Sequence, residues 1–571
     1  MDPLEPFQEQ IRNAVQHTFA AMGGDVAFEI EVPSTGVADF AVPCFPLAKV
    51  FRKAPPLIAE EAASKLPPMD LIARAWAEKG YLNFKLDDRR LNIATMGAVM
   101  DMRADYGRGN AGGVKVLLEH TSVNPTGPIH VGRARNPIIG DTLARCMRAY
   151  GYDVTTEYYV NDVGKQVVLL TWGLENIPSG EIEEVERDKA DHRLVLYYQK
   201  ANRMMEEDPQ VSKQVGQMLR RFEDGDEEVM VKVRRTAKLM LDGIIESLTS
   251  INVIIDQFTW ESEFIKDGTA HRVVEQLKRS EHCSVEEGAC YLELKSFGIH
   301  GKETRFFFTR ADGTTLYTTR DMAYHLDKFD RADRLINILG EDQKLGQTQL
   351  AIALKLLGKE RAPECVFYSF VSLPEGRMST RRGTVVYLDD LIEEAEERAL
   401  EEVRKRRTDL SEEKMMEIAR AIGRGAVRYN IVRVQPEKPL VFKWEDALNF
   451  EGNSAPFVQY AHARACSIQR KAGQPAGAFD PAVLTNEYEL RLIRVLARYP
   501  SVIKEAGEKE RIQALPAYGH ELAASFNQFY TYVPVLKGEE NRDARLALVD
   551  ATRVVLANVL TTLGLSAPEE M

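Results

Sequence analysis

The segment EHTSVNPTGPIHVGRARNPIIGD carries the residues best suited to phosphate chemistry, between an apolar run and a stretch with a helical pattern. Gly127 and Gly132 let a ligand approach the backbone closely, whereas Pro125 and Pro128 restrict the path of the chain. The first amide groups of a helix lack intrahelical partners and attract phosphates. There His130 would donate a hydrogen bond to oxygens that gain charge in a transition state. Capping or packing is the alternative for a lone histidine, and the surrounding glycines and prolines favour phosphate binding.

A second candidate for phosphate binding is the basic segment RMSTRRGTVV, which follows an apolar run. Arg377, Arg381 and Arg382 surround Ser379 and Gly383. Guanidinium groups bind phosphate oxygens in bidentate geometry, so such a loop is suited to clamping a polyphosphate. A solvated basic loop has the same composition, and the spacing alone does not decide between the two interpretations.

The elements around the first segment predict a parallel α/β sheet. VKVLLEH is an apolar, β-prone run, the helix after it is stopped by Gly151, and VTTEYYV is the next strand. Strand, helix and strand in this order form a βαβ unit. We therefore predict a Rossmann-like catalytic domain over residues 96–395, interrupted by a charged helical insertion at about 172–250. A helical bundle is predicted for residues 396–571.

Residues 1–95 predict a small α+β domain. GDVAFEIEVP and GYLNFKL alternate between apolar and polar residues, as a half-buried strand does. ADFAVPCFPLAKVFRKAPPLIAEEAASKL is interpreted as a loop that leads into a helix starting near Pro55.

Composition limits the class of protein. A chain of 571 residues is too long for one core and implies several domains. It has no apolar run of about eighteen residues and no secretory signal pattern, so we expect no membrane span and a cytoplasmic location. The six cysteines are scattered without a CxxC pair, which predicts neither a zinc site nor disulfides. A net charge of -12 requires any nucleic-acid-binding surface to be local.

The two phosphate-binding candidates resemble the two ATP motifs of class I aminoacyl-tRNA synthetases. HVGR is similar to the HIGH motif and RMSTR to the KMSK motif. Arg133, Arg377 and Thr380 depart from these consensus motifs, and such departures are common in arginyl-tRNA synthetases. EYYVNDVGKQ, LYTTRDMAYHLDKF and NSAPFVQYAHARACSI also resemble segments of that family, in the family's order. The resemblance covers nearly the whole chain.

The resemblance implies a ligase that joins L-arginine to tRNA(Arg) through an arginyl-adenylate. ATP with Mg²⁺ would be a substrate complex, and no prosthetic group, no dedicated metal site, no membrane contact and a monomer are expected. Two alternatives stay open. A HIGH-type nucleotidylyltransferase shares the strand, corner and helix, and a non-catalytic tRNA-binding paralogue shares the overall sequence.

The resemblance also implies the site residues. Arginine needs carboxylates and planar acceptors, and the expected contacts are Glu119, Asn124, Tyr317, Asp321 and Gln343. Tyr317 and Asp321 are four residues apart and share a helical face. Asp321 is the expected main partner of the guanidinium group.

The family's two ATP motifs supply the expected ATP-binding and catalytic residues. These are Gly127, His130, Gly132, Arg133, Arg377, Met378, Ser379 and Arg382. Thr380 stands where the motif has a lysine, and Arg133, Arg381 or Lys115 could replace that cation. Lys115 is equally interpreted as a strand-edge residue.

For tRNA, the expected contacts mix aromatic and cationic groups, as proteins do where they bind single-stranded loops. They are Asn83 in the first domain and Tyr460, His462, Arg464 and Arg470 on one helix. The alternative for the helix is an amphipathic bundle helix with solvated charges.

Overall fold

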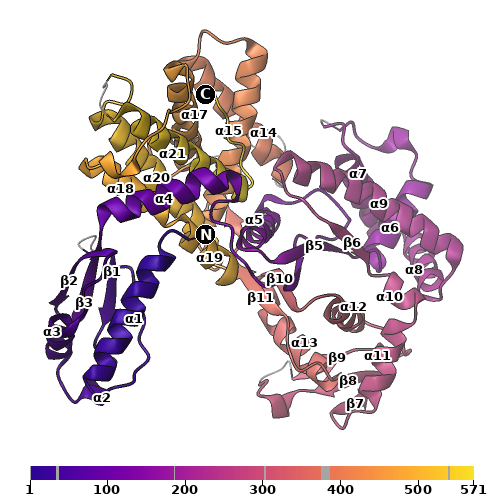
Figure 1. Ribbon diagram of the computed structural model, residues 1–571. Coiled ribbons are helices and arrows are strands. Elements are labelled where there is room, and N and C mark those ends of the chain that lie inside the picture. Colours follow the sequence, from indigo (N-terminus) through magenta and orange to yellow (C-terminus); the bar gives the residue numbers. More distant parts are fainter. Residues whose placement is uncertain (1, 34–37, 186, 301–303, 375–385, 538–540) are drawn as a thin grey trace.

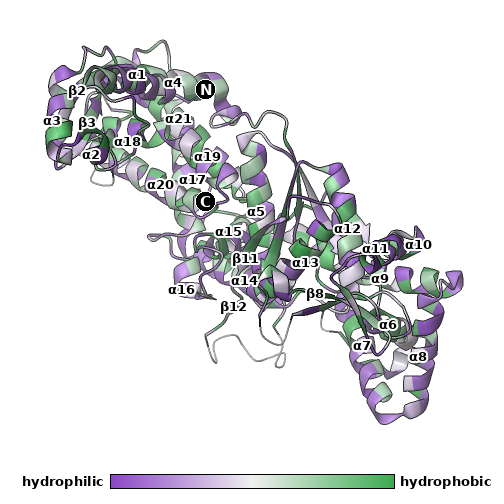
Figure 2. Ribbon diagram, turned by 90° about the horizontal axis from the view of Figure 1, so that it is seen from below, coloured by the Kyte–Doolittle hydropathy of each residue, from purple (hydrophilic) through white to green (hydrophobic). Residues whose placement is uncertain are grey.

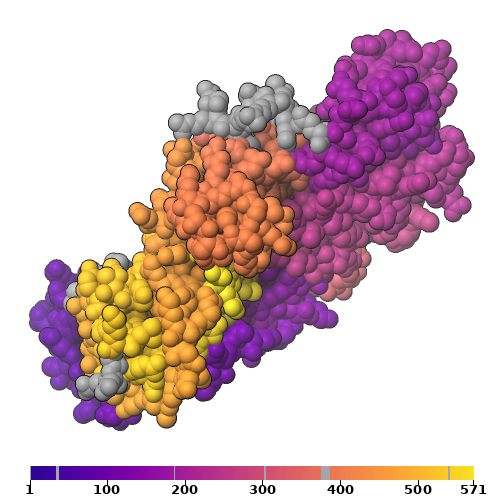
Figure 3. All heavy atoms as spheres, turned by 90° about the horizontal axis from the view of Figure 1, so that it is seen from above, coloured from indigo at the N-terminus to yellow at the C-terminus, as the bar shows by residue number. Residues whose placement is uncertain are grey.

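The structure is a computed structural model with an elongated outline (Figures 1 and 3). It describes residues 2–33, 38–185, 187–300, 304–374, 386–537 and 541–571. The N-terminal residues and the C-terminal helices lie at one end, and the helical insertion lies at the other end (Figure 3). The helices described include none with the length and hydrophobicity that crossing a bilayer requires.

The N-terminal module is a three-stranded antiparallel sheet, in the order β1-β3-β2, covered by helices. Its elements are α1 (Glu5–Ala21), β1 (Phe40–Pro43), α2 (Ala48–Phe51), α3 (Pro55–Lys65), β2 (Ile72–Glu78) and β3 (Tyr81–Leu86). The strand GYLNFKL and the helix that starts at Pro55 are confirmed. The strand predicted for GDVAFEIEVP is wrong, because the segment makes only an isolated bridge from Glu31 to Ala41. The predicted loop before Pro55 contains β1.

The central sheet has five parallel strands in the order β11-β10-β4-β5-β6. The strands are β4 (Lys115–Glu119), β5 (Asp153–Val160), β6 (Gln257–Trp260), β10 (Arg334–Gly340) and β11 (Glu364–Tyr368). From β4 the chain first adds β5 and β6 on one side and later β10 and β11 on the other. The direction of winding therefore reverses between β4 and β10, where ligands bind at the carboxyl ends of parallel strands. Figure 2 shows β11 between the C-terminal helices and the two insertions.

The helix after β4 is α5 (Arg135–Tyr150), preceded by the 3₁₀ turn η2 (Val131–Arg133). Gly151 ends α5 in a left-handed conformation with φ of 102°, as the sequence predicts. Helices α6 (Lys165–Asn176), α7 (Ala190–Glu207), α8 (Pro209–Glu223) and α9 (Glu227–Ser250) lie between β5 and β6 and form the helical insertion (Figure 1).

A second insertion separates β6 from β10 and contains a three-stranded antiparallel sheet. Its elements are α10 (Glu263–Lys266), α11 (Thr269–Lys278), β7 (Cys283–Glu286), β8 (Ala289–Glu293), β9 (Arg305–Phe307) and α12 (Tyr317–Arg331). Helix α12 packs against α11 and β8 through Met322 and Ala323 and contacts β10 through His325 and Lys328, and α13 (Lys344–Leu356) connects β10 to β11.

The C-terminal part is helical, as predicted. It contains α14 (Leu388–Arg406), α15 (Glu412–Val432), α16 (Trp444–Ala447), α17 (Ala455–Ala472), α18 (Glu487–Ala497), α19 (Tyr499–Glu508), α20 (Ala514–Tyr532) and α21 (Arg542–Thr562). Helix α4 (Asp88–Met102) runs along this bundle from the N-terminal module (Figure 1). The short parallel pair β12 (Val371–Ser372) and β13 (Leu440–Val441) joins the bundle to the end of the sheet.

One buried arginine connects helix α5 to the bundle. Arg428 of α15 is 1 % exposed, and it donates hydrogen bonds to the Asp141 carboxylate of α5 (2.5 Å) and to the carbonyl oxygens of Ile251 (2.8 Å) and Leu563 (3.0 Å). A buried guanidinium group needs all of these acceptors, because burying its charge without partners costs several kcal/mol of folding free energy. The ends of α9 and α21 therefore meet at α5.

Candidate active site

A cavity of about 450 Å³ lies at the point where the sheet reverses its winding, next to the carboxyl ends of β4 and β10. The residues predicted to contact arginine come from three separate parts of the chain, and all of them line this cavity: Glu119, Asn124, Tyr317, Asp321 and Gln343. Arg133 lines it as well. The structure thus brings the predicted arginine site together beside the glycine- and proline-rich corner.

The corner holds His130 in one orientation. The Gly132 amide donates to Nδ1 of His130 at 3.0 Å, so Nε2 carries the ring proton and is the available donor. A Cβ atom at Gly132 would lie 3.1 Å from Nδ1, which explains the glycine at this position. Partial burial and the neighbouring charge of Arg133 lower the pKa of His130. His130 is therefore suited to donate to an anion beside the cavity.

The backbone of the corner pairs with the segment that enters α14. The Val131 amide donates to the Val386 carbonyl (2.9 Å), and the Leu388 amide donates to the Ile129 carbonyl (2.7 Å). The catalytic corner and the helical bundle are thus connected by main-chain hydrogen bonds.

Charges in the cavity are not fully balanced. Glu119 pairs with Lys328, and Glu261 pairs with Arg320 at 2.5 Å. Asp321 has no lysine or arginine partner among the residues that the structure describes. Asp342 also lines the cavity and has no lysine or arginine partner among the described residues, so the excess negative charge of the cavity lies at Asp321 and Asp342, whereas Glu119 and Glu261 have their own cations. This charge favours a cationic ligand.

Sequence reasoning missed Glu261 and Tyr159, which also line the cavity. Glu261 is 2 % exposed, and burial raises its pKa to about 7 in spite of the charge of Arg320. It directly follows Trp260, the last residue of β6. Because ligands bind at the carboxyl ends of parallel strands, this position could have identified Glu261 as a site residue. Tyr159 stacks on Tyr324 with ring centroids 4.2 Å apart.

The remaining ATP-site candidates are distributed as follows. Arg377, Met378, Ser379 and Arg382, together with Thr380 and Arg381, lie outside the described residues. Gly127 lies against the insertion, since a Cβ atom there would be 3.0 Å from Val195 of α7. Lys115 is exposed at the amino end of β4, about 13 Å from Glu119 at roughly 3.3 Å per residue, so it does not reach the cavity.

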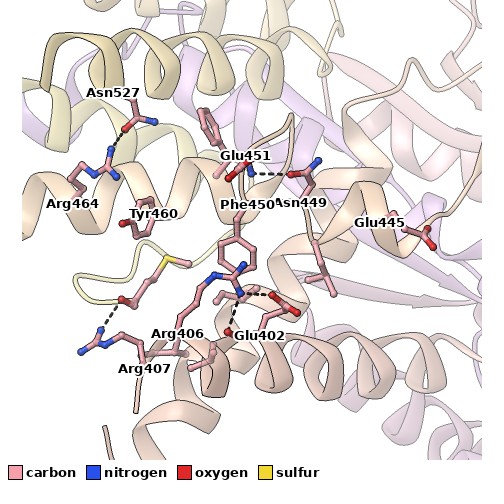
Figure 4. A pocket seen from close by; sticks show the side chains of 16 residues that line it. Glu402, Arg406, Arg407, Glu445, Asn449, Phe450, Glu451, Tyr460, Arg464 and Asn527 are labelled. Atoms are coloured by element: carbon pink, nitrogen blue, oxygen red, sulfur yellow. Dashed lines mark hydrogen bonds and ion pairs between the residues drawn. The ribbon is translucent and has the colours of Figure 1, made fainter. Parts of the chain in front are cut away.

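A second cavity of about 850 Å³ lies among the C-terminal helices (Figure 4). Tyr460 and Arg464 of α17 line it, as do Phe450, Arg406 and Asn527. The Arg464 guanidinium donates to Asn527 (2.6 Å) and stacks 4.8 Å from the ring centre of Tyr460, which is 41 % exposed. An exposed aromatic ring beside guanidinium groups is suited to stacking with a nucleic-acid base.

Three predicted tRNA contacts have other surroundings. His462 is 3 % exposed, and its ring donates to the Pro568 carbonyl at 2.9 Å, because two residues beyond Tyr460 a side chain lies on the opposite face of the helix. Arg470 donates to the Glu569 carbonyl at 3.2 Å. Asn83 is 9 % exposed within β3. His462 and Arg470 thus hold the C-terminal segment against α17.

Comparison with known proteins assigns most of the chain to three family models. A family model described as "tRNA synthetases class I (R), catalytic domain" matches residues 98–444, "DALR anticodon binding domain" matches 458–571, and "Arginyl tRNA synthetase N terminal domain" matches 6–86. The fold and the HIGH-like corner thus define a class I aminoacyl-tRNA synthetase.

Relatives identify the family within this class. The arginine--tRNA ligase of Methanocella arvoryzae is 47% identical over 92% of each chain, and that of Methanothermobacter thermautotrophicus is 40% identical over 99% of each chain. The structure of Thermus thermophilus arginyl-tRNA synthetase superposes with a TM-score of 0.83 at 29% identity, over 99% of this chain and 100% of that one. The chain belongs to the arginyl-tRNA synthetase family, which confirms the predicted fold class and family.

Proposed function

We propose that this enzyme joins L-arginine to tRNA(Arg) in two steps within one active site. The arginine carboxylate attacks the α-phosphorus of ATP, which enters as its Mg²⁺ complex, and pyrophosphate leaves. A hydroxyl of the terminal ribose of tRNA then attacks the carbonyl of the arginyl-adenylate, which forms the ester and releases AMP. The observation that carries the proposal is the cavity with excess negative charge at Asp321 and Asp342, beside the corner that holds His130.

Substrate contacts follow from the charges of the cavity. The guanidinium group of arginine pairs with Asp321. A carboxylate accepts two parallel hydrogen bonds from a guanidinium group, but only one from the ammonium group of a lysine side chain. Glu119 and Asn124 at the end of β4 accept from the α-ammonium group. Tyr317 and Gln343 complete the wall around the side chain.

Catalysis rests on positioning and on charge stabilisation. His130 donates from Nε2 to phosphate oxygens of ATP, and the positive end of the α5 helix dipole lies beside the same group. Arg133 adds a positive charge at the rim of the cavity. The KMSK-like residues Arg377, Met378, Ser379 and Arg382 are proposed to contact the leaving pyrophosphate.

Recognition of tRNA uses the two other parts of the chain. In this proposal residues 1–95 contact the body of tRNA, residues 396–571 bind the anticodon, and residues 96–395, with the insertion at 172–250, perform the chemistry. The cavity beside Tyr460 and Arg464 receives an anticodon base. A single chain contains every named residue, so we propose a monomer that works in the cytoplasm, where tRNA is charged.

Arginine-dependent pyrophosphate exchange, measured with and without tRNA, tests the function. Exchange that needs arginine supports the ligase, exchange with another metabolite supports a nucleotidylyltransferase, and no exchange supports a non-catalytic paralogue. For tRNA binding, a steep loss of affinity between low and moderate salt is expected, because bound phosphates release counterions. A flat salt dependence would contradict the proposed tRNA surface.

A further inference from the structure

Two carboxylates of the arginine site are connected through the wall of the cavity, which His325 and Asn337 also line. Asp321, His325 and Lys328 follow at intervals of four and three residues, so they lie on one face of α12, which points toward the sheet. Asn337 of β10 is the direct register partner of Glu119 on β4. Glu119 and Asn337 of the sheet therefore lie opposite Asp321, His325 and Lys328 of α12.

Hydrogen bonds link the side chains of Glu119, Lys328, Asn337 and His325, and His325 also contacts Asp321. Lys328 donates to Glu119 and to Oδ1 of Asn337, the latter at 3.0 Å. Nδ2 of Asn337 lies 2.9 Å from Nε2 of His325. Nδ1 of His325 lies 2.9 Å from the carbonyl oxygen of Asp321 and 3.0 Å from its carboxylate. We call Lys328, Asn337 and His325 the relay.

The donors determine the direction of every bond in the relay. An ammonium group can only donate, so the amide oxygen of Asn337 faces Lys328 and its nitrogen faces His325. Nε2 of His325 must then accept, which leaves the ring proton on Nδ1, the atom that faces Asp321. Lys328, His325 and Asn337 are 0, 1 and 2 % exposed, and buried polar groups in this position keep their partners. The tautomer of His325 is thus set by Lys328.

We propose that His325 and Asn337 are positioning residues for arginine, which orient the Asp321 carboxylate from behind. The side chain of Asp321 is 35 % exposed and is not held by a lysine or arginine of the described chain. A bidentate contact with a guanidinium requires one orientation of the carboxylate plane, and the Nδ1 proton of His325 selects it. Lys328 holds Asn337 in its orientation, and Glu119 balances the charge of Lys328. The negative charge of Asp321 is therefore not neutralised by Lys328 and is available to the substrate.

Two substitutions of the same histidine test the direction of the relay. The inference rests on the proposed function, so the assay is arginine-dependent pyrophosphate exchange in the presence of tRNA. The amide nitrogen of His325→Asn replaces Nδ1 and still donates to Asp321, whereas the amide of His325→Gln reaches the position of Nε2 and loses that contact. We expect the KM for arginine to change less than about twofold in His325→Asn and to rise about tenfold in His325→Gln, which is the effect of one buried hydrogen bond. The kcat and the KM for ATP should stay within about twofold.

Asn337→Leu removes the middle of the relay and should raise the KM for arginine about fivefold, again with the KM for ATP unchanged. His271→Asn, on the exposed surface of α11, is the matched control and should behave as wild type. Equal effects of the two His325 substitutions, or parallel losses for arginine and ATP, would overturn the relay while leaving the function intact. Absence of arginine-dependent exchange in the wild-type protein would overturn the function and the relay with it.

Discussion

Asp321→Asn tests the assignment of the guanidinium partner most directly. Asparagine keeps the shape of the side chain, but it replaces one acceptor by a donor and removes the negative charge. It also keeps an oxygen that can accept from His325. The substitution therefore changes the interaction with the substrate far more than the packing of α12.

The expected size follows from the contacts and from the exposure of the carboxylate. A hydrogen bond to a charged group contributes about 1.5–3 kcal/mol. The Asp321 side chain is 35 % exposed, so solvent screens part of the charge and the lower half of this range applies. A loss of about 2 kcal/mol corresponds to a rise of about 30-fold in the KM for arginine, at about 1.4 kcal/mol per factor of ten.

Steady-state pyrophosphate exchange, with arginine and ATP varied separately, is the appropriate assay. Asp327→Asn is a matched control on the same helix, because Asp327 is 43 % exposed and pairs only at the surface with Arg331 at 2.8 Å. The control should change neither KM by more than about twofold. Equal rises in the KM values for arginine and ATP in Asp321→Asn, or an equal loss in Asp327→Asn, would refute the reasoning.

Four further predictions concern catalysis and stability. His130→Ala should slow arginyl-adenylate formation by about 10²–10³ while tRNA affinity is kept, and a wild-type exchange rate would exclude His130 as a donor. Burial and the neighbouring Glu364 raise the pKa of Glu510 from 4.5 to about 7, so the folded state binds a proton that the unfolded state releases. Stability should therefore fall as pH rises from about 5 to 7.5, and Glu510→Gln should flatten this dependence in thermal melts. In Gly140→Ala the new Cβ would lie 2.4 Å from the His120 ring, so unfolding should be easier by about 1–3 kcal/mol, and an unchanged melting temperature would contradict this packing. Arginine activation should require bound tRNA, because the backbone of the catalytic corner pairs with the segment that enters the bundle, and robust exchange without tRNA would disprove this coupling.

Local sequence signals were sufficient for the elements that carry the site. A buried strand, a corner with glycines and a helix that ends at Gly151 follow from neighbouring residues alone, and β4, η2 and α5 have this form. Tyr317 and Asp321 share the cavity because a helical period places them on one face. Such relations depend on the geometry of a single element.

Other features depend on contacts with segments that are distant in the sequence. The segment GDVAFEIEVP alternates as a strand does, yet it meets the outer edge of β1 through a single bridge, from Glu31 to Ala41, and does not pair further. His462 and Tyr460 belong to the same amphipathic helix, and only the packing of the C-terminal segment decides that His462 faces inward. The relay behind Asp321 requires three elements to meet, which no local pattern contains.

The buried contacts of Arg428 also determine when the catalytic domain can be completed during synthesis. Asp141 of α5 leaves the ribosome 287 residues before its partner Arg428, and Leu563 follows another 135 residues later. At a translation rate of roughly 5–20 residues per second, Arg428 is synthesised about 15–60 s after Asp141. During that interval Asp141 is paired only with Arg145 of its own helix, and the face of α5 that the bundle covers in the folded protein is exposed. The active site is therefore finished only near the end of translation, and this interval is when the chain is most exposed to aggregation and to chaperones.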